Sequence, residues 1–447
     1  MYEPATGRTA SGAGPDLACT LGVGVAFDRE PAVSEIRHDP YLSRFASRTR
    51  EMSASEIRAL FAVASRPEVV SLAGGMPFVG ALDHDVVAEV TRSVVAEDGD
   101  VALQYGGGQG YAPLREQLAG VMAAEGVAAH ADDLVVTTGG QQGLDLVGKL
   151  FLDPGDVVLA EGPSYVGALG AFRTYEADVE HVPMDSDGLI PAVLEERIAQ
   201  LRRDGRAAKF LYTVPNHQNP AGVSLSTERR EAIAEICARE DLLIVEDNPY
   251  GLLDFKGDLR PALRTLAPDR VIYVGTLSKI FSAGIRVGWV AAAGPVRDKV
   301  VLLKEGADLC QSNLTQLIAE RWLRTQPWQE QVAAFREVYR ERCDAMLTEL
   351  SAELPAEATW SVPGGGFFVW LRLPRGVDSR ELLAKALNAR VAYVPGAAFF
   401  ADGTGGDHLR LSFCYPPPDR IREGVRRFAE ALREEMELVT ALYGDSR

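Results

Sequence analysis

The chain has 447 residues, of which 47% are hydrophobic and 24% charged, as expected for a globular protein with a large core and a second, smaller domain. The net charge of −17 argues against nucleic-acid binding, and no apolar segment is long enough to predict a membrane span. Five cysteines are dispersed without CxxC or metal-ligand spacing, so we expect no metal and reduced thiols in a cytoplasmic protein.

The first part of the chain is predicted to be an N-terminal arm. Residues 1 to about 35 are rich in Gly, Ala and small polar residues, and Ser53–Phe61 has the pattern of a capped helix. From about residue 71 to 325, apolar strands alternate with helices, one of which begins near Gly140. This alternation predicts an α/β fold with a mostly parallel sheet covered by helices on both faces. The expected strands are 134–138, 156–160, 210–214, 242–246, 271–276 and 287–292.

The pattern changes after about residue 320. An amphipathic helix is expected at 327–350, and short strands and helices follow it to the end of the chain. The expected elements are strands at 367–373, near 391 and at 408–414, and helices around 382 and at 418–443. We therefore expect three parts: an arm and the start of the small domain at 1–70, a large domain at 71–325, and a small α+β domain at 326–447.

The segment from Tyr273 to Trp289 carries the most specific chemistry. An apolar strand ends in the hydroxyl residues Thr276 and Ser278, Lys279 follows, and Arg286 stands seven residues later. An amine can form a Schiff base with a carbonyl, and an arginine with hydroxyls suits a phosphate. Pyridoxal 5′-phosphate (PLP) has both groups. The alternative is a lysine and an arginine that merely solvate a surface turn.

Polar residues also stand at other strand ends, where ligands bind in such sheets. Asp247 ends a strand and can keep a pyridine nitrogen protonated, with Tyr250 close by, although Asp-Asn-Pro also reads as a turn. Asn219 lies in a Pro- and Gly-stiffened loop, and residues 138–143 can form an anion cradle at a helix start. Arg410 stands on an apolar strand, where it can bind a carboxylate or lie on a solvated face.

These segments together resemble the class I/II aminotransferases of fold type I, most closely the branch with 2-aminoadipate and kynurenine aminotransferases. The likeness runs from about Ser53 to the C-terminus and includes Ser71–Pro77, Gln104–Tyr105, Gly110–Arg115 and Pro363–Phe368. It implies a PLP-binding large domain and ping-pong transfer of an amino group between an amino acid and a 2-oxo acid in amino acid metabolism. It also implies a homodimer with shared active sites, and neither nucleic acid nor membrane as a partner.

The resemblance also implies residue roles. Lys279 would form the internal aldimine and move the substrate's α-proton, and Asp247 would pair with the pyridine nitrogen. Tyr250 and Asn219 would hold the phenolic oxygen, and Tyr165 would stack on the ring. The phosphate would be bound by Gly140, Gln141, Thr276, Ser278 and Arg286, and by Tyr105 of the neighbouring subunit. Arg410 would bind the substrate α-carboxylate, with Asn219 and the Gly75 backbone nearby.

Four departures from the family pattern leave the substrate open. Gly140 replaces a frequent hydroxyl residue, and Gly106–Gln109 replaces a bulkier stretch, which suggests a more open pocket. Glu51, beside Arg50, stands where relatives that bind acidic side chains tend to carry Arg. His217 could be an extra acid/base or substrate contact, or simply a loop histidine that is exposed or packed on the cofactor edge.

Two other functions are alternatives to transamination. The same constellation supports decarboxylation, β-elimination, cyclisation or oxidative chemistry in specialised metabolism, because the cofactor supplies the electron sink in each case. A transcriptional regulator with an aminotransferase-like domain would need a winged-helix module before Ser53, and the preceding 50 or so residues show no such pattern.

Overall fold

The computed structural model describes residues 41–50 and 66–444. These residues belong to two units of the chain, residues 1–50 and 51–447. The first unit contributes a 3-10 turn at Leu42–Arg44 and the short helix α1 at Ser47–Arg50. The helix predicted at Ser53–Phe61, Glu51 and most of the predicted arm lie outside the described residues.

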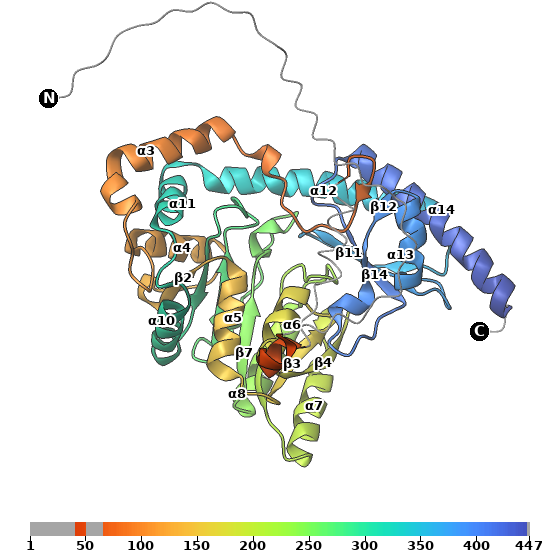
Figure 1. The fold of residues 1–447 in the computed structure, drawn as a ribbon, viewed down its shortest axis with the longest axis horizontal. Coiled ribbons are helices and arrows are strands. Elements are labelled where there is room, and N and C mark those ends of the chain that lie inside the picture. Colours follow the sequence, from red (N-terminus) through yellow and green to blue (C-terminus); the bar gives the residue numbers. More distant parts are fainter. Residues whose placement is uncertain (1–40, 51–65, 445–447) are drawn as a thin grey trace, which may run out of the picture. The chain divides into compact units, whose positions relative to one another are not determined.

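An eight-stranded sheet forms the centre of the second unit, with the strand order β2-β9-β8-β7-β6-β3-β4-β5 (Figure 1). Neighbouring strands from β8 through to β4 pair in parallel, whereas β9 and β5 run antiparallel to their neighbours. The predicted mostly parallel sheet is therefore confirmed. The strands are β2 (Leu134–Thr137), β3 (Val157–Gly162), β4 (Asp178–Asp185), β5 (Gly188–Leu189), β6 (Ala208–Thr213), β7 (Leu243–Asp247), β8 (Val271–Thr276) and β9 (Gly288–Ala291).

Strand β4 was not predicted from the sequence. It lies near the sheet edge, where only the two residues of β5 pair with its outer side. Asp178 and Glu180 therefore stay in contact with solvent, and the strand lacks the continuous apolar run that marks its neighbours. A search for apolar strands misses such an edge strand.

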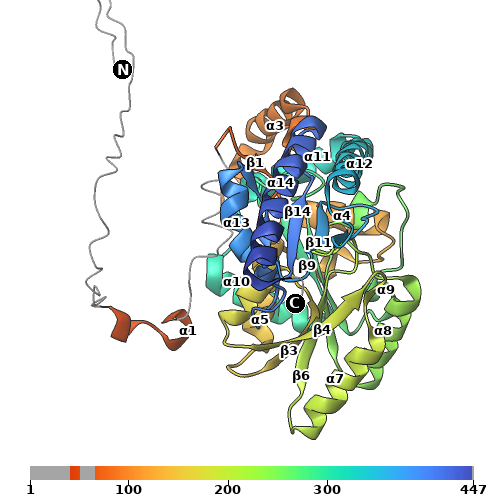
Figure 2. The ribbon, with the colours of Figure 1, turned by 90° about the vertical axis from the view of Figure 1, so that its right-hand side faces the viewer.

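Helices cover both faces of the sheet, as its apolar strands require. In β6, Phe210 and Tyr212 face one core together with side chains of α5 and α6, while Leu211 faces a second core with α7 and α8. Figure 2 shows α5 and α8 on opposite sides of β3 and β6. The helices of this region are α3 (His84–Ala102), α4 (Ala112–Ala124), α5 (Gly140–Phe151), α6 (Val166–Arg173), α7 (Pro191–Arg203), α8 (Thr227–Arg239), α9 (Leu263–Leu266), α10 (Gly294–Asp308) and α11 (Asn313–Thr325).

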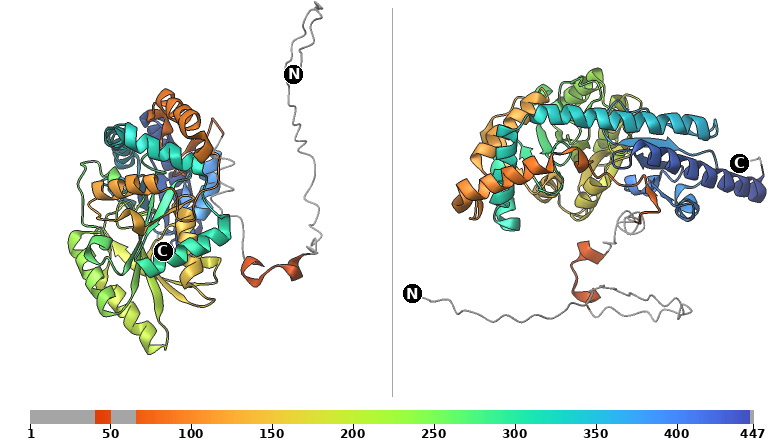
Figure 3. Two further views of the ribbon diagram at one scale, coloured as in Figure 1. Left: turned by 90° about the vertical axis from the view of Figure 1, so that its left-hand side faces the viewer. Right: turned by 90° about the horizontal axis from the view of Figure 1, so that it is seen from above.

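A smaller antiparallel sheet has the order β10-β11-β14-β13, and β1 pairs in parallel with β12. The predicted helices at 327–350 and 418–443 are present as α12 and α14, which pack along each other (Figure 3). The elements are β1 (Val70–Ser71), β10 (Thr359–Trp360), β11 (Phe368–Arg372), β12 (Val391–Ala392), β13 (Val394–Pro395), β14 (His408–Ser412), α12 (Trp328–Glu353), α13 (Ser379–Asn388) and α14 (Pro418–Tyr443).

The topology places the candidate residues together at the carboxyl ends of the central strands of the large sheet. Strands β6, β7 and β8 run in parallel, so their carboxyl ends at Thr213, Asp247 and Thr276 lie on the same side. A bridge between Asp254 and Gly365 joins the segment after β7 to the turn before β11 of the small sheet. Within residues 41–50 and 66–444, no helix is long and apolar enough to cross a membrane.

Candidate active site

A cavity of about 350 Å³ lies at the carboxyl ends of the central strands. All the predicted site residues line it except Tyr105. Those residues are Gly75, Gly140, Gln141, Tyr165, Asn219, Asp247, Tyr250, Thr276, Ser278, Lys279, Arg286 and Arg410. Side chains from both sheets therefore meet here, although the chain segments that carry them are far apart in sequence.

Lys279 follows β8, and its amine reaches into the cavity. Nζ donates a hydrogen bond to the carbonyl oxygen of Gly75 at 2.9 Å and lies 5.3 Å from the ring centre of Phe367. Burial is the main reason that the pKa of this amine falls to about 8. A substantial fraction of the lysine is therefore neutral near physiological pH and can act as a nucleophile or a base.

Asp247 is the last residue of β7 and is buried at the cavity wall. Its Oδ2 accepts a hydrogen bond from the Tyr212 hydroxyl at 2.8 Å. Burial raises the pKa of this carboxyl to about 7, against the opposing effect of the Tyr212 hydrogen bond. A cation placed beside Asp247 would restore its ionised form.

An anion cradle lies between the end of β2 and the start of α5. The 12-residue helix α5 begins at Gly140, so the backbone N–H groups at its first turn are available to an anion. Gly139 has φ = +76°, and a Cβ atom there would lie 2.5 Å from the Arg286 guanidinium. Glycine is therefore required at this position, because the Arg286 guanidinium occupies the space that a side chain would need. Thr276 donates through Oγ1 to Ser278 Oγ at 2.8 Å on the other side.

The end of α10 braces this cradle from outside the cavity. Gln142 accepts a hydrogen bond from the Thr138 backbone N–H at 2.7 Å and donates through Nε2 to Asp308 Oδ2, also at 2.7 Å. The fully buried Lys304 pairs with the other oxygen of Asp308 at 3.0 Å. Arg286 donates to the Thr138 carbonyl at 3.1 Å, so Thr138 is held from both sides.

Arg410 lies on β14, one of the two inner strands of the small sheet, and is only 4% exposed. Its guanidinium donates to Asn219 Oδ1 at 2.8 Å and to the Ala73 carbonyl at 2.6 Å, and it lies 4.1 Å from the Phe368 ring centre. Burial lowers its pKa to about 10, so the group remains a cation. Among the described residues it forms no ion pair, and its Nε has no hydrogen-bond partner. The solvated strand face is therefore ruled out for Arg410.

Two tyrosines complete the cavity wall. Tyr165 precedes α6 and donates from its hydroxyl to Gln141 Oε1 at 3.4 Å. Tyr250 is buried, with its ring edge-on to Phe367 at a centroid distance of 5.3 Å. Both rings therefore face the cavity from positions that the surrounding side chains hold in place.

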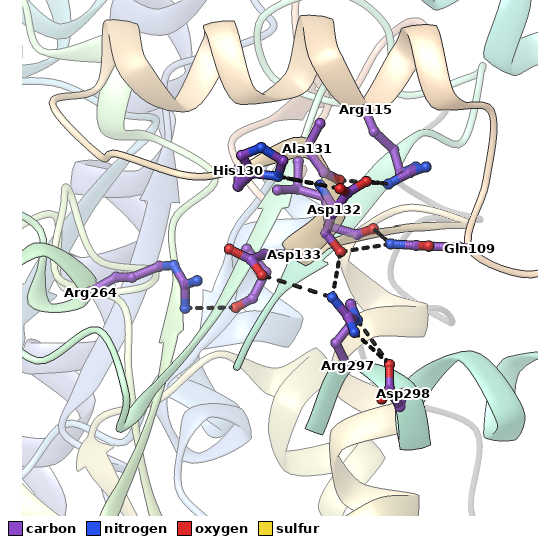
Figure 4. A network of polar contacts seen from close by, with 11 residues as sticks. Gln109, Arg115, His130, Ala131, Asp132, Asp133, Arg264, Arg297 and Asp298 are labelled. Atoms are coloured by element: carbon purple, nitrogen blue, oxygen red, sulfur yellow. Dashed lines mark hydrogen bonds and ion pairs between the residues drawn. The ribbon is translucent and has the colours of Figure 1, made fainter. Parts of the chain in front are cut away.

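The loop Gly106–Gln109 and Tyr105 lie away from the cavity walls. Gln109 donates through Nε2 to the carbonyls of Asp132 and Leu134 at 2.8 and 3.0 Å, and Arg297 donates to the same Asp132 carbonyl at 2.9 Å (Figure 4). The loop is therefore anchored to the start of β2. Tyr105 is 77% exposed.

Three residues near the site were not assigned correctly from the sequence. Tyr212 binds Asp247, and its position at the end of a strand, on the same face as Phe210, was an available signal. Phe368 belongs to a family motif but was given no role of its own, and its ring packs against the Arg410 guanidinium. His217 is 2% exposed and does not line the cavity, so neither an exposed histidine nor a direct substrate contact describes it.

The arrangement combines a partly neutral amine, a buried carboxyl, an anion cradle and an unpaired buried guanidinium in one cavity. An amine can bond to a carbonyl carbon, a cradle with Arg286 can hold a phosphate, and Arg410 can hold a carboxylate. These capacities match a phosphate-bearing aldehyde and an amino acid.

Comparison with known proteins identifies the family. Residues 68–428 match the family model for aminotransferase class I and II. The chain is 39% identical over 398 residues to aromatic-amino-acid aminotransferase 1 of Thermococcus litoralis, covering 89% of this chain and 95% of that protein. The structure matches Pyrococcus horikoshii kynurenine aminotransferase in complex with PMP with a TM-score of 0.85 and 37% identity, covering 89% and 99% of the two chains.

A second solved structure adds the cofactor chemistry of a relative. The α-aminoadipate aminotransferase of Thermus thermophilus, complexed with N-(5′-phosphopyridoxyl)-L-leucine, matches with a TM-score of 0.82 and 38% identity, over 89% of this chain and 99% of that one. The sequence-based resemblance is thus confirmed. The chain is an aminotransferase and belongs to the class I and II family.

Proposed function

We propose that this enzyme moves an amino group between an amino acid and a 2-oxo acid in a ping-pong cycle, with PLP as its cofactor. The observation that carries the proposal is one cavity in which Lys279, Asp247 and Arg410 surround a common space. Bound PLP supplies an aldehyde that bonds to amines and a ring that withdraws electrons from the substrate's α-carbon. The protein's part is to bind, orient and move protons.

The residues of this chain fit PLP. Gly139 leaves space that a Cβ atom would fill, and the first turn of α5 offers the backbone N–H groups of Gly140 and Gln141. Arg286, Thr276 and Ser278 supply a cation and hydroxyls to the phosphate. Among the described residues, Arg286 forms no ion pair and donates only to carbonyl oxygens.

Lys279 Nζ would hold the cofactor in the resting enzyme, and its free amine would accept the proton from the substrate's α-carbon. The lowered pKa of about 8 supports both roles, because the neutral amine is the nucleophile and the base. The Gly75 carbonyl, which accepts from Nζ at 2.9 Å, holds the amine at the cavity wall.

The remaining cofactor contacts follow from position. Asp247 would keep the pyridine nitrogen protonated, and Tyr212 orients the Asp247 carboxyl. The Tyr250 hydroxyl would hold the phenolic oxygen together with the Asn219 amide, whose N–H group is the one that remains because the Asn219 oxygen accepts from Arg410. Tyr165 would stack on the ring.

Arg410 binds the substrate α-carboxylate, with Gly75 and Asn219 close by. A buried guanidinium without a carboxylate partner is costly, and a bound carboxylate compensates it with charge-assisted hydrogen bonds. The same site serves the amino acid and the 2-oxo acid, because both carry this carboxylate.

The active form is proposed to be a homodimer with shared active sites. Tyr105 and Leu103 are 77% and 70% exposed, and neither lines the cavity of its own chain. A phosphate contact from Tyr105 therefore requires a second copy. Light scattering should give twice the mass of one chain, and Tyr105→Phe should weaken PLP binding. A monomer of full activity would contradict this part.

Two further assignments belong to the proposal. The large domain at 71–325 binds PLP, and residues 326–447 with part of 1–70 form the small domain, as supported by the parallel pairing of β1 with β12. The enzyme works in amino acid metabolism in the cytoplasm, where Cys237, Cys310, Cys343 and Cys414 stay reduced, in keeping with their free thiols here. Fractionation of the producing cells and metabolite analysis of a deletion strain test this assignment.

The decisive experiment uses the cofactor-loaded enzyme and a panel of amino acids, with no 2-oxo acid acceptor. Each true donor should convert the bound cofactor to pyridoxamine phosphate and release one equivalent of its 2-oxo acid. Absorption spectra and mass spectrometry follow the two products. Release of CO₂, ammonia or a β-substituent without pyridoxamine phosphate would contradict transamination.

A further inference from the structure

His217 lies at the junction of three segments around the cavity without touching the cavity itself. Its Nδ1 is 3.3 Å from Ser224 Oγ, its Nε2 is 3.5 Å from Asp254 Oδ2, and its backbone N–H donates to Ser224 Oγ at 2.9 Å. The side chain is 3% exposed and that of Asp254 is 7% exposed. The pair is therefore internal, and solvent does not weaken it.

Asp254 in turn joins the segment after β7 to the small sheet. It forms the bridge with Gly365, and its Oδ1 accepts from the backbone N–H groups of Lys256 and Asp258 at 2.9 and 3.1 Å. On the other side of this bridge, Phe255 donates its backbone N–H to the Gly364 carbonyl at 2.8 Å. The carboxyl that faces His217 is thus held by its own loop and adjoins the turn before β11.

The imidazole also fills the space beside that turn. A Cβ atom on Gly365 would lie 2.5 Å from His217 Nε2, and one on Gly366 would lie 2.6 Å from His217 Cβ. Gly366 in addition has φ = +67°. The ring therefore packs directly on the backbone of the glycine turn, and the turn can approach only because it has no side chains there.

Two of the groups that contact the Arg410 guanidinium lie two residues from these contacts. Asn219, two residues after His217, accepts from the Arg410 guanidinium at 2.8 Å. Phe368, two residues after Gly366, places its ring 4.1 Å from the same guanidinium. A change in the distance between the His217 loop and the glycine turn therefore changes the spacing of these two groups, while the third contact, to the Ala73 carbonyl, comes from another segment.

We propose that His217, together with Asp254, is a positioning residue that sets the distance between the Asn219 loop and the Gly364–Gly366 turn and thereby orients Arg410 toward the substrate carboxylate. This inference rests on the proposed role of Arg410 in substrate binding. It assigns His217 no proton transfer, since the ring lies outside the cavity.

The imidazole is neutral in this role. Burial lowers the pKa of His217 to about 4, although Asp254 opposes the shift, and the cations Arg260 and Arg230 lower it further. A neutral imidazole can accept from the Ser224 hydroxyl at one nitrogen and donate toward Asp254 from the other. It therefore bridges two loops without needing a charge.

The test compares His217→Phe, His217→Asn and Asp254→Asn in the full-length, cofactor-loaded enzyme. Phenylalanine keeps the ring but removes both nitrogens, whereas asparagine keeps a polar group and tolerates the positive φ of +45° at this position. A misplacement of a substrate-positioning group by about 1 Å can lower the reaction rate roughly a hundredfold, and a smaller shift of Arg410 has a smaller effect. We therefore expect KM for both the amino acid and the 2-oxo acid to rise about tenfold in His217→Phe. We expect kcat and the dissociation constant of PLP to change less than KM, by about threefold at most, because Asn219 is only one of the proposed cofactor contacts and those of Lys279 and Arg286 are untouched.

A matched control is available on the surface. His130 Nδ1 lies 3.5 Å from Asp132 Oδ2, the same separation as in the buried pair, but the two side chains are 76% and 71% exposed. His130→Phe should leave all parameters unchanged. In the Asp254→Asn background, His217→Phe should raise KM much less than in the wild type, because the two residues act through one contact.

The outcomes separate the inference from the proposed function. If Arg410→Gln leaves KM unchanged, the carboxylate role of Arg410 fails, and the inference fails with it. If Arg410→Gln raises KM but the His217 and Asp254 variants only lower the melting temperature, the proposed function stands and His217 has a merely structural role. A loss of PLP affinity in His217→Phe that exceeds the rise in KM would also overturn the inference, because it would place the main effect on the cofactor.

Discussion

The two walls of the cavity handle buried charge in opposite ways. On the wall built from the large sheet, Asp247 and Lys279 are buried in one cavity, and each has a pKa shifted toward its neutral form. On the wall built from the small sheet, Arg410 keeps its charge and is held only by neutral oxygens and aromatic rings. The first wall adjusts protonation, whereas the second maintains an uncompensated cation.

This difference matches the ligands that the two walls are proposed to hold. A resident cofactor stays in place, so the protonation of Asp247 can adjust once, when the cofactor binds, and the partly neutral Lys279 can exchange a proton beside it in each cycle. A substrate that arrives and leaves in each cycle needs a site that stays ready in its absence, and arginine is suited to this because it does not lose its proton in proteins. The predictions below test whether the two walls do act separately, in order of expected effect.

Lys279→Ala should produce the largest loss. Removing the amine removes the proposed base at the α-carbon. General acid–base catalysis of this kind contributes roughly 10²–10⁴-fold to the rate. Borohydride should no longer fix PLP to the chain, while the fold stays intact by circular dichroism. Lys209→Ala, which removes a partly exposed lysine paired with Asp156, is the control. Covalent labelling that persists in Lys279→Ala would show that this lysine is not the residue that bonds PLP.

Arg410→Gln should affect the substrate wall alone. Loss of charge-assisted hydrogen bonds to a carboxylate costs about 3 kcal/mol, so kcat/KM should fall roughly a hundredfold. The dissociation constant of PLP should stay within about twofold of the wild-type value. The free energy of unfolding of the substrate-free enzyme should rise, because a buried cation without a carboxylate partner is removed.

Arg372→Gln on β11 is the matched control, since Arg372 is exposed and pairs with Asp407 at 3.1 Å. It should leave kinetics unchanged. Loss of PLP affinity in Arg410→Gln, measured by equilibrium dialysis, would show that the two walls are not independent.

Tyr212→Phe should act on the cofactor wall through Asp247. Its hydroxyl lowers the pKa of that carboxyl, so its removal should move the pKa above the wild-type value of about 7. Because one pKa unit changes the ionised fraction of the cofactor-free enzyme up to about tenfold, PLP affinity at pH 7 should fall by up to that factor and recover at higher pH. Tyr393→Phe, which loses a 2.7 Å hydrogen bond to the Ser379 carbonyl away from the cavity, should not shift the profile.

The same carboxyl makes the stability of the cofactor-free protein depend on pH. In the unfolded chain Asp247 ionises near its usual pKa of 3.8, but in the folded chain it stays protonated to about 7. Unfolding therefore releases a proton between these values, and this contribution to stability falls as pH rises through that window. In Tyr212→Phe the fall should continue to higher pH in urea titrations. An unchanged pH dependence would show that the Tyr212 hydroxyl does not influence the pKa of Asp247.

Gln142→Leu should have the smallest effect. It removes the link between Thr138 and Asp308 without touching the cavity, so PLP affinity should fall roughly fivefold, about 1 kcal/mol. KM values at saturating PLP should not change. Gln200→Leu, on the exposed side of α7, is the control for added apolar surface. A rise in KM with unchanged PLP affinity would show that Gln142 supports substrate binding instead of cofactor binding.

The sequence by itself determined the sheet, the cofactor and most of the residues that line the cavity. Continuous apolar strands alternating with helices imply parallel pairing, and parallel strands bring their carboxyl ends to one edge. Asp247 and Thr276 are the last residues of their strands and Lys279 follows shortly after, so their meeting in one cavity could be predicted from local patterns. The family resemblance supplied the cofactor.

Only the tertiary structure decided which distant side chains meet. Tyr212 and Asp247 are 35 residues apart, and their contact depends on β6 lying beside β7. His217 belongs to a loop whose sequence does not say what it packs against, and only the bridge between Asp254 and Gly365 brings the glycine turn to its ring. Local patterns report the faces and ends of single elements. The pairing of buried groups between elements depends instead on strand order and loop packing, which are properties of the whole fold.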